Sequence, residues 1–220
     1  MNGLTAIGLG LAGALAGVPV AALAYSASGA GPVRMPQRWW AGGPARPARV
    51  MATAGATGAA GAIIGAAVPP TFALPAFWVF AVLGVGLAII DARCRRLPHR
   101  LTGALWASSG LCFVVVAATG GGAQPVIRAA GAGFATAAVL LLVALALPGQ
   151  LGLGDVMFAG AVTFTLGWLS WQAAVIGILA GLLTQGVVVL AVKVFGRDQA
   201  ASPMGPALLT GWLLAIALTA

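Results

Sequence analysis

Acidic residues are nearly absent from this chain. Its 220 residues contain three Asp, no Glu, one His and two Cys, and only 6% of positions are charged. So few acids exclude a carboxylate-rich metal cage and a soluble surface built on ion pairs. Cys94 and Cys112 lie 18 positions apart and form no CxxC pair, so neither a zinc ribbon nor a disulfide framework is supported. The single histidine, His99, has no partners for a metal site or a Ser-His-Asp triad.

Hydrophobic residues make up 61% of the chain, and the mean hydropathy is +1.05. Because a membrane-spanning helix needs about 20 apolar residues, the sequence predicts an all-α, polytopic transmembrane helix bundle in one integral-membrane domain, residues 1–220. Eight spans are expected, of which the sixth and eighth are short and the second is rich in Ala, Gly and Thr, so that a strict hydropathy threshold counts six or seven. The expected spans are Gly3 to Tyr25, Met51 to Val68, Phe72 to Ile90, Leu101 to Thr119, Ala129 to Leu147, Val156 to Leu169, Trp171 to Val192 and Gly205 to Thr219.

The basic residues divide unequally between the two sides of this topology. Arg128 stands alone on one side. By the positive-inside rule the richer side is cytoplasmic, which puts both termini outside and makes the Gly- and Pro-rich stretch 26–49 a cytoplasmic loop. The net charge of +8 therefore records membrane orientation, and no nucleic-acid partner is predicted. The ten basic residues on the predicted cytoplasmic side are Arg34, Arg38, Arg46, Arg49, Arg93, Arg95, Arg96, Arg100, Lys193 and Arg197.

Two features of the N-terminal third of the chain lead to further expectations. The first span lacks a basic segment before it, so we expect a retained span rather than a cleaved signal peptide. Gly61 and Gly65 form a GxxxG pair, which lets a neighbouring backbone approach one face of the helix. This pair suits contacts within or between chains, and the oligomeric state is left open.

Each of the three aspartates is interpreted separately. Asp91 ends the third span, where the helix dipole disfavours a carboxylate, and the simplest structural role is an i,i+4 pair with Arg95. Asp155 opens the sixth span, where Asp is a favoured N-cap. Gly152 and Gly154 precede it and free the backbone for unusual conformations or for a substrate approaching closely. Asp198 reads as a solvated loop charge.

The topology relates Asp91 to Asp155. Two spans separate them, so both carboxyl groups return to the same end of the bundle. Two carboxyl groups brought together in a poorly solvated place tend to share one proton. One can then take a proton from water while the other donates to a peptide carbonyl, which is the chemistry of an aspartic protease and needs no metal or cofactor.

Three segments resemble motifs of the type IV prepilin leader peptidases, membrane aspartic proteases of the GxGD type. The segment 91–102 resembles the first motif, an aspartate followed by basic residues and Ile-Pro-Asn-x-Leu-Thr. The segment 152–156 reads Gly-Leu-Gly-Asp-Val and is similar to the second motif, Gly-x-Gly-Asp-Val. The segment 202–208, Ser-Pro-Met-Gly-Pro-Ala-Leu, is similar to a third feature, Pro-Phe-Gly-Pro-Phe-Leu. The resemblance extends over about residues 72–219.

The resemblance implies that Asp91 and Asp155 are the catalytic pair, in an active-site loop that includes Gly152 and Gly154. It implies removal of short basic leader peptides from prepilins or pseudopilins at the cytoplasmic face of a bacterial inner membrane. Met157 and His99 depart from the family pattern, which commonly has Lys and Asn there. Many relatives also methylate the new N-terminus with a domain carrying paired CxxC motifs, and the 26–49 loop has no Cys. We therefore expect a peptidase without methyltransferase activity.

Two alternatives from other classes remain open. Intramembrane carboxylates also mark proton- or cation-coupled transporters, although transport sites usually lie near the midplane rather than at span ends. The second alternative is an inactive relative of the peptidases that serves as a scaffold in pilus assembly.

Overall fold

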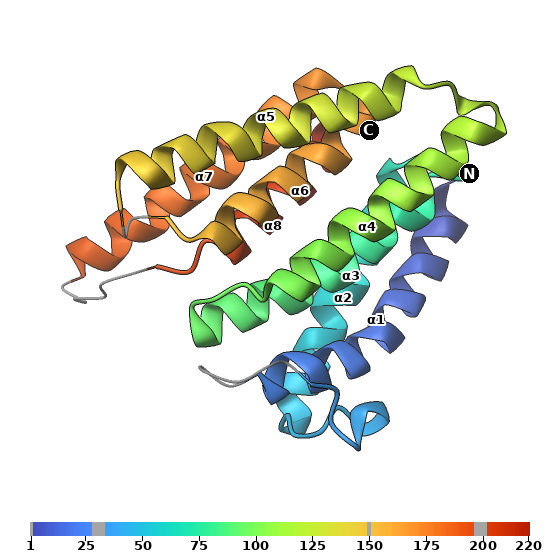
Figure 1. Cartoon of the computed structure of the whole chain (residues 1–220). Helices are drawn as coiled ribbons and strands as arrows, with labels where there is room; N and C mark the ends of the chain where they lie inside the picture. Colours follow the sequence, from blue (N-terminus) through green and yellow to red (C-terminus); the bar gives the residue numbers. More distant parts are fainter. Residues whose placement is uncertain (1, 28–33, 149–150, 196–201) are drawn as a thin grey trace.

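The computed structural model describes residues 2–27, 34–148, 151–195 and 202–220, which contain eight α-helices (Figure 1). No β-strand occurs among these residues. Six of the helices are long and apolar enough to cross a membrane, so the prediction of an all-α polytopic bundle is confirmed. The helices are α1 (Asn2–Ser26), α2 (Pro47–Ala67), α3 (Leu74–Cys94), α4 (His99–Val116), α5 (Gln124–Ala146), α6 (Leu153–Leu169), α7 (Trp171–Val194) and α8 (Gly205–Thr219).

Several helix ends differ by a few residues from the sequence-based expectation, and α5 begins at Gln124, five positions before the predicted Ala129. Helix α2 begins at Pro47, four positions before the predicted Met51, because the fixed φ of proline suits the first turn of a helix. Helix α3 continues one turn beyond the predicted Ile90, to Cys94. The predicted loop 26–49 therefore ends earlier, and it contains a short 3₁₀ helix at Trp39–Ala41.

Helices α3, α6 and α8 are the inner helices of the bundle, and the other five lie around them. Figure 1 shows α1–α4 on one side of the molecule and α5–α8 on the other. Helix α3 packs against α1, α2, α4 and α8, and α6 packs against α4, α5, α7 and α8. In α6, 11 of 17 residues are buried, and in α8, 8 of 15, compared with 4 of 24 in α7. The two short helices are therefore enclosed by their neighbours, which explains how they belong to the bundle without full span length.

Aromatic side chains join the three inner helices. The ring centroid of Phe80 on α3 lies 4.6 Å from that of Trp212 on α8 and 6.2 Å from that of Phe158 on α6. The indole N–H of Trp212 donates to the hydroxyl of Thr165 at 2.8 Å, so this buried polar group has a partner. These contacts fix α3, α6 and α8 relative to one another.

Helices α1 and α2 pack at backbone distance. A Cβ added at Gly61 would lie 2.3 Å from the carbonyl oxygen of Leu9, and one at Gly65 would lie 2.5 Å from that of Thr5. Gly13 on α1 has the same relation to Thr57. The close approach predicted from the GxxxG pair is confirmed, and its partner helix is α1 of the same chain.

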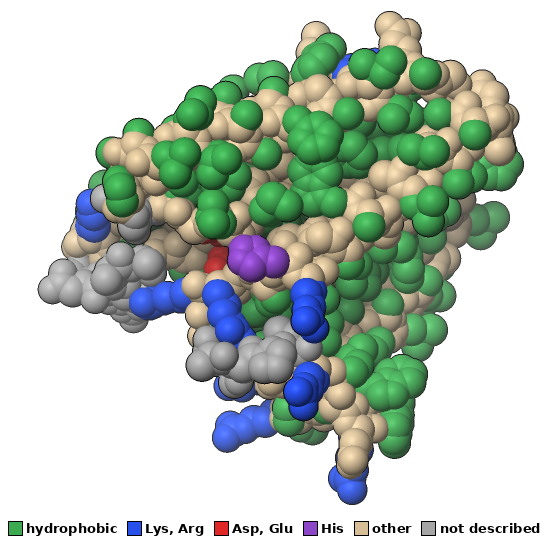
Figure 2. Space-filling model, in the orientation of Figure 1, with side chains coloured by type: hydrophobic (Ala, Val, Ile, Leu, Met, Phe, Trp, Pro, Cys, Tyr) green, Lys and Arg blue, Asp and Glu red, His purple; other side chains and the backbone are tan. Residues whose placement is uncertain are grey.

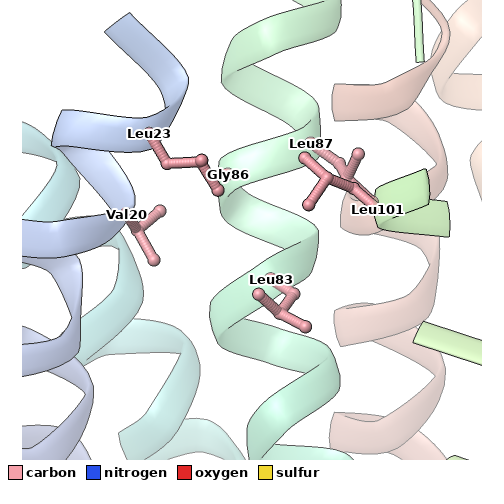
Figure 3. Close-up of a pocket in the computed structure, with 6 residues that line it drawn as sticks. All are labelled: Val20, Leu23, Leu83, Gly86, Leu87 and Leu101. Carbon is pink, nitrogen blue, oxygen red and sulfur yellow. The ribbon is translucent and has the colours of Figure 1, made fainter. Parts of the chain in front are cut away.

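Helices α1 and α3 leave a small void beside the start of α4 (Figure 3). Its volume is about 10 Å³, and aliphatic side chains and one glycine line it. A space so small and apolar has no hydrogen-bond partners to hold a water molecule. It is a packing defect rather than a binding site. The lining residues labelled in Figure 3 are Val20, Leu23, Leu83, Gly86, Leu87 and Leu101.

The far end of α6 is held by Arg128 of α5. Its guanidinium donates to the carbonyl oxygens of Gly167 at 2.6 Å and Leu169 at 2.9 Å, and also to that of Trp168. These are carbonyl groups of the last helical turn, which have no partners within the helix. Arg128, the single basic residue on its side in the predicted topology, fixes the end of α6 opposite to Asp155.

Candidate active site

Basic side chains gather at one end of the molecule, whereas hydrophobic side chains cover most of the rest of the visible face (Figure 2). This end contains the C-terminal ends of α1 and α3 and the first turns of α2, α4, α6 and α8, as the hydrogen bonds and close contacts between them show. Acidic side-chain atoms are visible at the same end in Figure 2. The carboxyl groups and the basic loops predicted to share one side therefore do so.

Asp91 lies in the last turn of α3 and is 4% exposed. The C-cap of α3 is Arg95, which adopts a left-handed conformation with φ 51° and donates its amide to the carbonyl oxygen of Asp91 at 2.7 Å. Asp91 is thus one turn inside the helix and not its last residue. This extra turn places the carboxyl group in the protein interior.

The Asp91 carboxyl group meets the first turn of α8. Its Oδ2 accepts a hydrogen bond from the backbone amide of Gly205 at 2.7 Å, although the two residues are 114 positions apart. The N-cap of α8, Met204, provides no side-chain cap, so Asp91 supplies a partner for an otherwise orphaned amide. The positive end of the α8 dipole also favours a negative charge at this position.

Glycine at position 205 is explained by lack of space. A Cβ added there would lie 3.1 Å from both Cβ and Oδ2 of Asp91. In the sequence, Gly205 stands out only as part of the family-like segment 202–208, which predicts no role for it. Nothing in the local sequence indicates that its amide faces a residue so far away in the chain.

Asp155 is the third residue of α6, whose N-cap is Gly152. The prediction of an N-cap at Asp155 is therefore wrong by three positions. The carboxyl group instead reaches back and interacts with the backbone amide of Gly152, as the N3 residue of a capping box does. The side chain is half-buried, and its location in the first turn is favourable for a carboxylate.

The two carboxyl groups are close enough to interact electrostatically. Asp91 comes from α3 and Asp155 from α6, with α4 and α5 between them in the chain, as the topology requires. Burial also disfavours the charged form of both carboxyl groups. Two carboxyl groups that influence each other in this way titrate as a pair.

The two glycines before Asp155 adopt backbone conformations that do not require glycine. Gly152 has φ −79° and ψ 144°, a conformation open to any residue, and Gly154 has no positive φ. A Cβ at Gly154 would lie 2.8 Å from Cβ of Leu97, in the loop after α3. A Cβ at Gly152 would lie 3.1 Å from Oδ2 of Asp155. Gly152 therefore leaves space beside the Asp155 carboxyl group, and Gly154 leaves space for Leu97, while neither uses a backbone conformation reserved for glycine.

The remaining candidate residues lie around this pair. His99 is exposed at the first position of α4, and Met157 is 41% exposed in α6, where its carbonyl oxygen accepts from the indole of Trp106 at 2.9 Å. Asp198 and Arg197 lie outside the described residues. Within the described part of the chain, no three His, Cys, Asp or Glu side chains lie together.

Fold and site together define a multi-pass α-helical membrane protein with two interacting carboxyl groups at one end of the bundle. Residues 78–190 match the model of the type IV leader peptidase family. The match covers about half of the chain and includes both Asp91 and Asp155, and the chain belongs to this family. The segment 202–208 lies beyond the matched residues. No curated protein and no solved structure matches the chain.

Proposed function

We propose that this chain is an aspartic endopeptidase that removes the basic leader peptide from prepilin- or pseudopilin-like proteins. The observation that carries the proposal is that the carboxyl groups of Asp91 and Asp155 lie at the same end of the bundle, near enough for the charge of Asp91 to act on Asp155. Membership of the leader peptidase family supports peptide hydrolysis in general. The aspartic mechanism, the substrate and the orientation are parts of the proposal.

The hydrogen bonds suggest which carboxyl group acts as the base and which as the acid. Gly205 donates to Oδ2 of Asp91 at the N-terminus of α8, where a negative charge is favoured. We therefore assign Asp91 as the base that takes a proton from the attacking water. Asp155, half-buried in the first turn of α6, is assigned as the acid that donates to the peptide carbonyl oxygen. The two groups exchange these roles when the amine leaves, so the pair returns to its starting protonation state.

The proposed location is a bacterial inner membrane with the site facing the cytoplasm. The gathering of basic side chains at the end that holds both carboxyl groups supports this orientation, because loops rich in Arg and Lys stay on the cytoplasmic side (Figure 2). Both chain termini lie at the other end in Figure 1, as an even number of crossings requires.

The reaction is proposed to end with cleavage, without methylation of the new N-terminus. The chain has only two cysteines, Cys94 and Cys112, and these lie in different helices. Paired CxxC motifs are therefore impossible in this sequence. Transfer of a methyl group by the purified protein would contradict this part of the proposal.

The test is leader removal in cells that co-express a candidate prepilin, followed as a gel shift. Wild type is compared with Asp91→Asn and Asp155→Asn, which keep the shape of each side chain and remove the acid. Asp198→Asn is the matched control, since it is the third aspartate of the chain and is expected to be a solvated charge. Cleavage by wild type and Asp198→Asn alone is the expected result. Normal cleavage by either of the other variants would refute the two-aspartate mechanism.

The same variants separate the peptidase from the scaffold alternative. A scaffold supports pilus assembly equally well with and without its carboxyl groups. If the asparagine variants assemble pili normally and no form cleaves any prepilin tested, the scaffold is correct.

A further inference from the structure

A groove of about 410 Å³ lies on the outside of the bundle between α2, α3 and α8, close to the end of α1. This volume is within the range of sites that bind small molecules. Along α3 the groove extends from Val85 to Ala92, about 10 Å at 1.5 Å per residue. This is most of the roughly 15 Å depth of one leaflet of the hydrocarbon core. Four small residues, Ala52, Ala56, Ala88 and Ala92, line it and leave the space between the helices.

The walls of the groove between α2, α3 and α8 are mostly hydrocarbon. The two threonines that line it are both occupied by their own helices: Thr53 donates to the carbonyl oxygen of Arg49 at 2.9 Å, and Thr210 donates to that of Pro206 at 2.8 Å. The other walls are aliphatic, apart from Tyr25 at one end. Such a surface suits an acyl chain.

Two arginines stand at the Tyr25 end. The guanidinium carbon of Arg93 lies 4.5 Å from the centre of the Tyr25 ring, and that of Arg49 lies 5.2 Å from it. Arg93 also donates to the carbonyl oxygen of Ala24 at 2.6 Å, which fixes its position. Both arginines are exposed. Two cations are thus held against one ring, and they attract an anion to the mouth of the groove.

The groove is distinct from the two-carboxyl site. The acidic residues of the described part of the chain are Asp91 and Asp155, and neither lines the groove. Gly205 packs against both Ala88 and Asp91, so the contact between α3 and α8 lies between the groove and the Asp91 carboxyl group. An occupant of the groove therefore leaves the carboxyl groups accessible from the other side.

We propose that this groove binds an anionic glycerophospholipid of the surrounding membrane, with one acyl chain between α2, α3 and α8 and the phosphate against Arg49 and Arg93. The combination of an apolar channel that spans most of one leaflet and two cations at its polar end matches the two parts of such a lipid. Basic pockets between membrane helices bind anionic head groups in the same way. The site is independent of the proposed peptidase activity.

The test is native mass spectrometry of the purified full-length protein in detergent, with phosphatidylglycerol and phosphatidylcholine of identical acyl chains supplied together. Wild type is expected to retain phosphatidylglycerol in preference. The double variant Arg49→Gln/Arg93→Gln is expected to lose about tenfold in this preference, the effect of one to two arginines near an anionic surface. The matched control is Arg38→Gln/Arg46→Gln, which removes two exposed arginines of the same loop region that do not stack on Tyr25.

A second variant tests the acyl-chain part of the site. Ala56→Leu fills the groove and is expected to lower retention of both lipids, while the protein remains folded by circular dichroism. Unchanged lipid preference in Arg49→Gln/Arg93→Gln would overturn the proposal. So would normal lipid retention by Ala56→Leu together with loss of leader cleavage, because the groove would then belong to the peptide substrate.

Discussion

Replacement of Gly205 by Ala tests how the Asp91 carboxyl group is held. Gly205 has no positive φ, so alanine adopts the same backbone conformation without strain. The added Cβ would lie 3.1 Å from Cβ and Oδ2 of Asp91, so one of the two groups must move by a few tenths of an ångström. The hydrogen bond of 2.7 Å between the Gly205 amide and Asp91 then lengthens.

The expected loss follows from the strength of that bond. A hydrogen bond to a charged group contributes about 1.5–3 kcal/mol, so its full loss lowers kcat/KM roughly 10- to 150-fold. Because Gly205→Ala weakens this hydrogen bond without removing it, we expect kcat/KM to fall about 10-fold. The fall should be mainly in kcat, because the amide orients an acid–base group and does not contact the peptide.

The assay is cleavage of a purified prepilin by purified enzyme in detergent, with initial rates at several substrate concentrations. Gly103→Ala is the matched control, since an added Cβ at Gly103 has no heavy atom within 4 Å. Thermal unfolding is measured for both variants to exclude a folding defect. If Gly205→Ala and Gly103→Ala both cleave at the wild-type rate, the amide does not position Asp91 and the role assigned to α8 is wrong.

Three further predictions concern close packing and helix ends. Gly154→Ala should lower cleavage because its Cβ would lie 2.8 Å from Cβ of Leu97 and displace the first turn of α6, whereas Gly186→Ala, which meets no atom within 4 Å, should be neutral in the same cleavage assay. Gly61→Leu should lower the thermal unfolding temperature because its side chain meets the α1 backbone at Leu9; Gly55→Leu, which points into open space, is the control, and equal temperatures would contradict the packing of α1 on α2. Arg128→Met should also lower the unfolding temperature, because three carbonyl groups at the end of α6 lose their donor; an unchanged temperature would mean that other groups satisfy them.

Most of the fold follows from the sequence because the membrane limits the choices. An apolar segment of about 20 residues must be a helix there, since its backbone groups have no other partners. The eighth predicted span, Gly205 to Thr219, has the same bounds as α8. The end of α3 was less predictable, because the turn from Asp91 to Cys94 carries polar and basic residues that read as a loop. Arg95 ends this helix in a left-handed conformation that its sequence does not indicate.

The candidate site was predictable in its two aspartates and less so in their surroundings. The crossing count alone brings Asp91 and Asp155 to one end. The hydrogen bond from Gly205 and the contact between Gly154 and Leu97 depend on the packing angles between α3, α6 and α8. Those angles are determined by interior side chains such as Phe80 and Trp212. A local sequence motif does not indicate these packing angles.

The hydrogen bond between Asp91 and Gly205 also has a consequence for synthesis of the protein. Asp91 is made 114 residues before the amide that holds it, and α8 follows every other helix in the chain. A nascent chain with its first seven helices in the membrane already carries both aspartates, but the amide that orients the first of them is missing. The surroundings of Asp91 are thus completed only when α8 packs between α3 and α6.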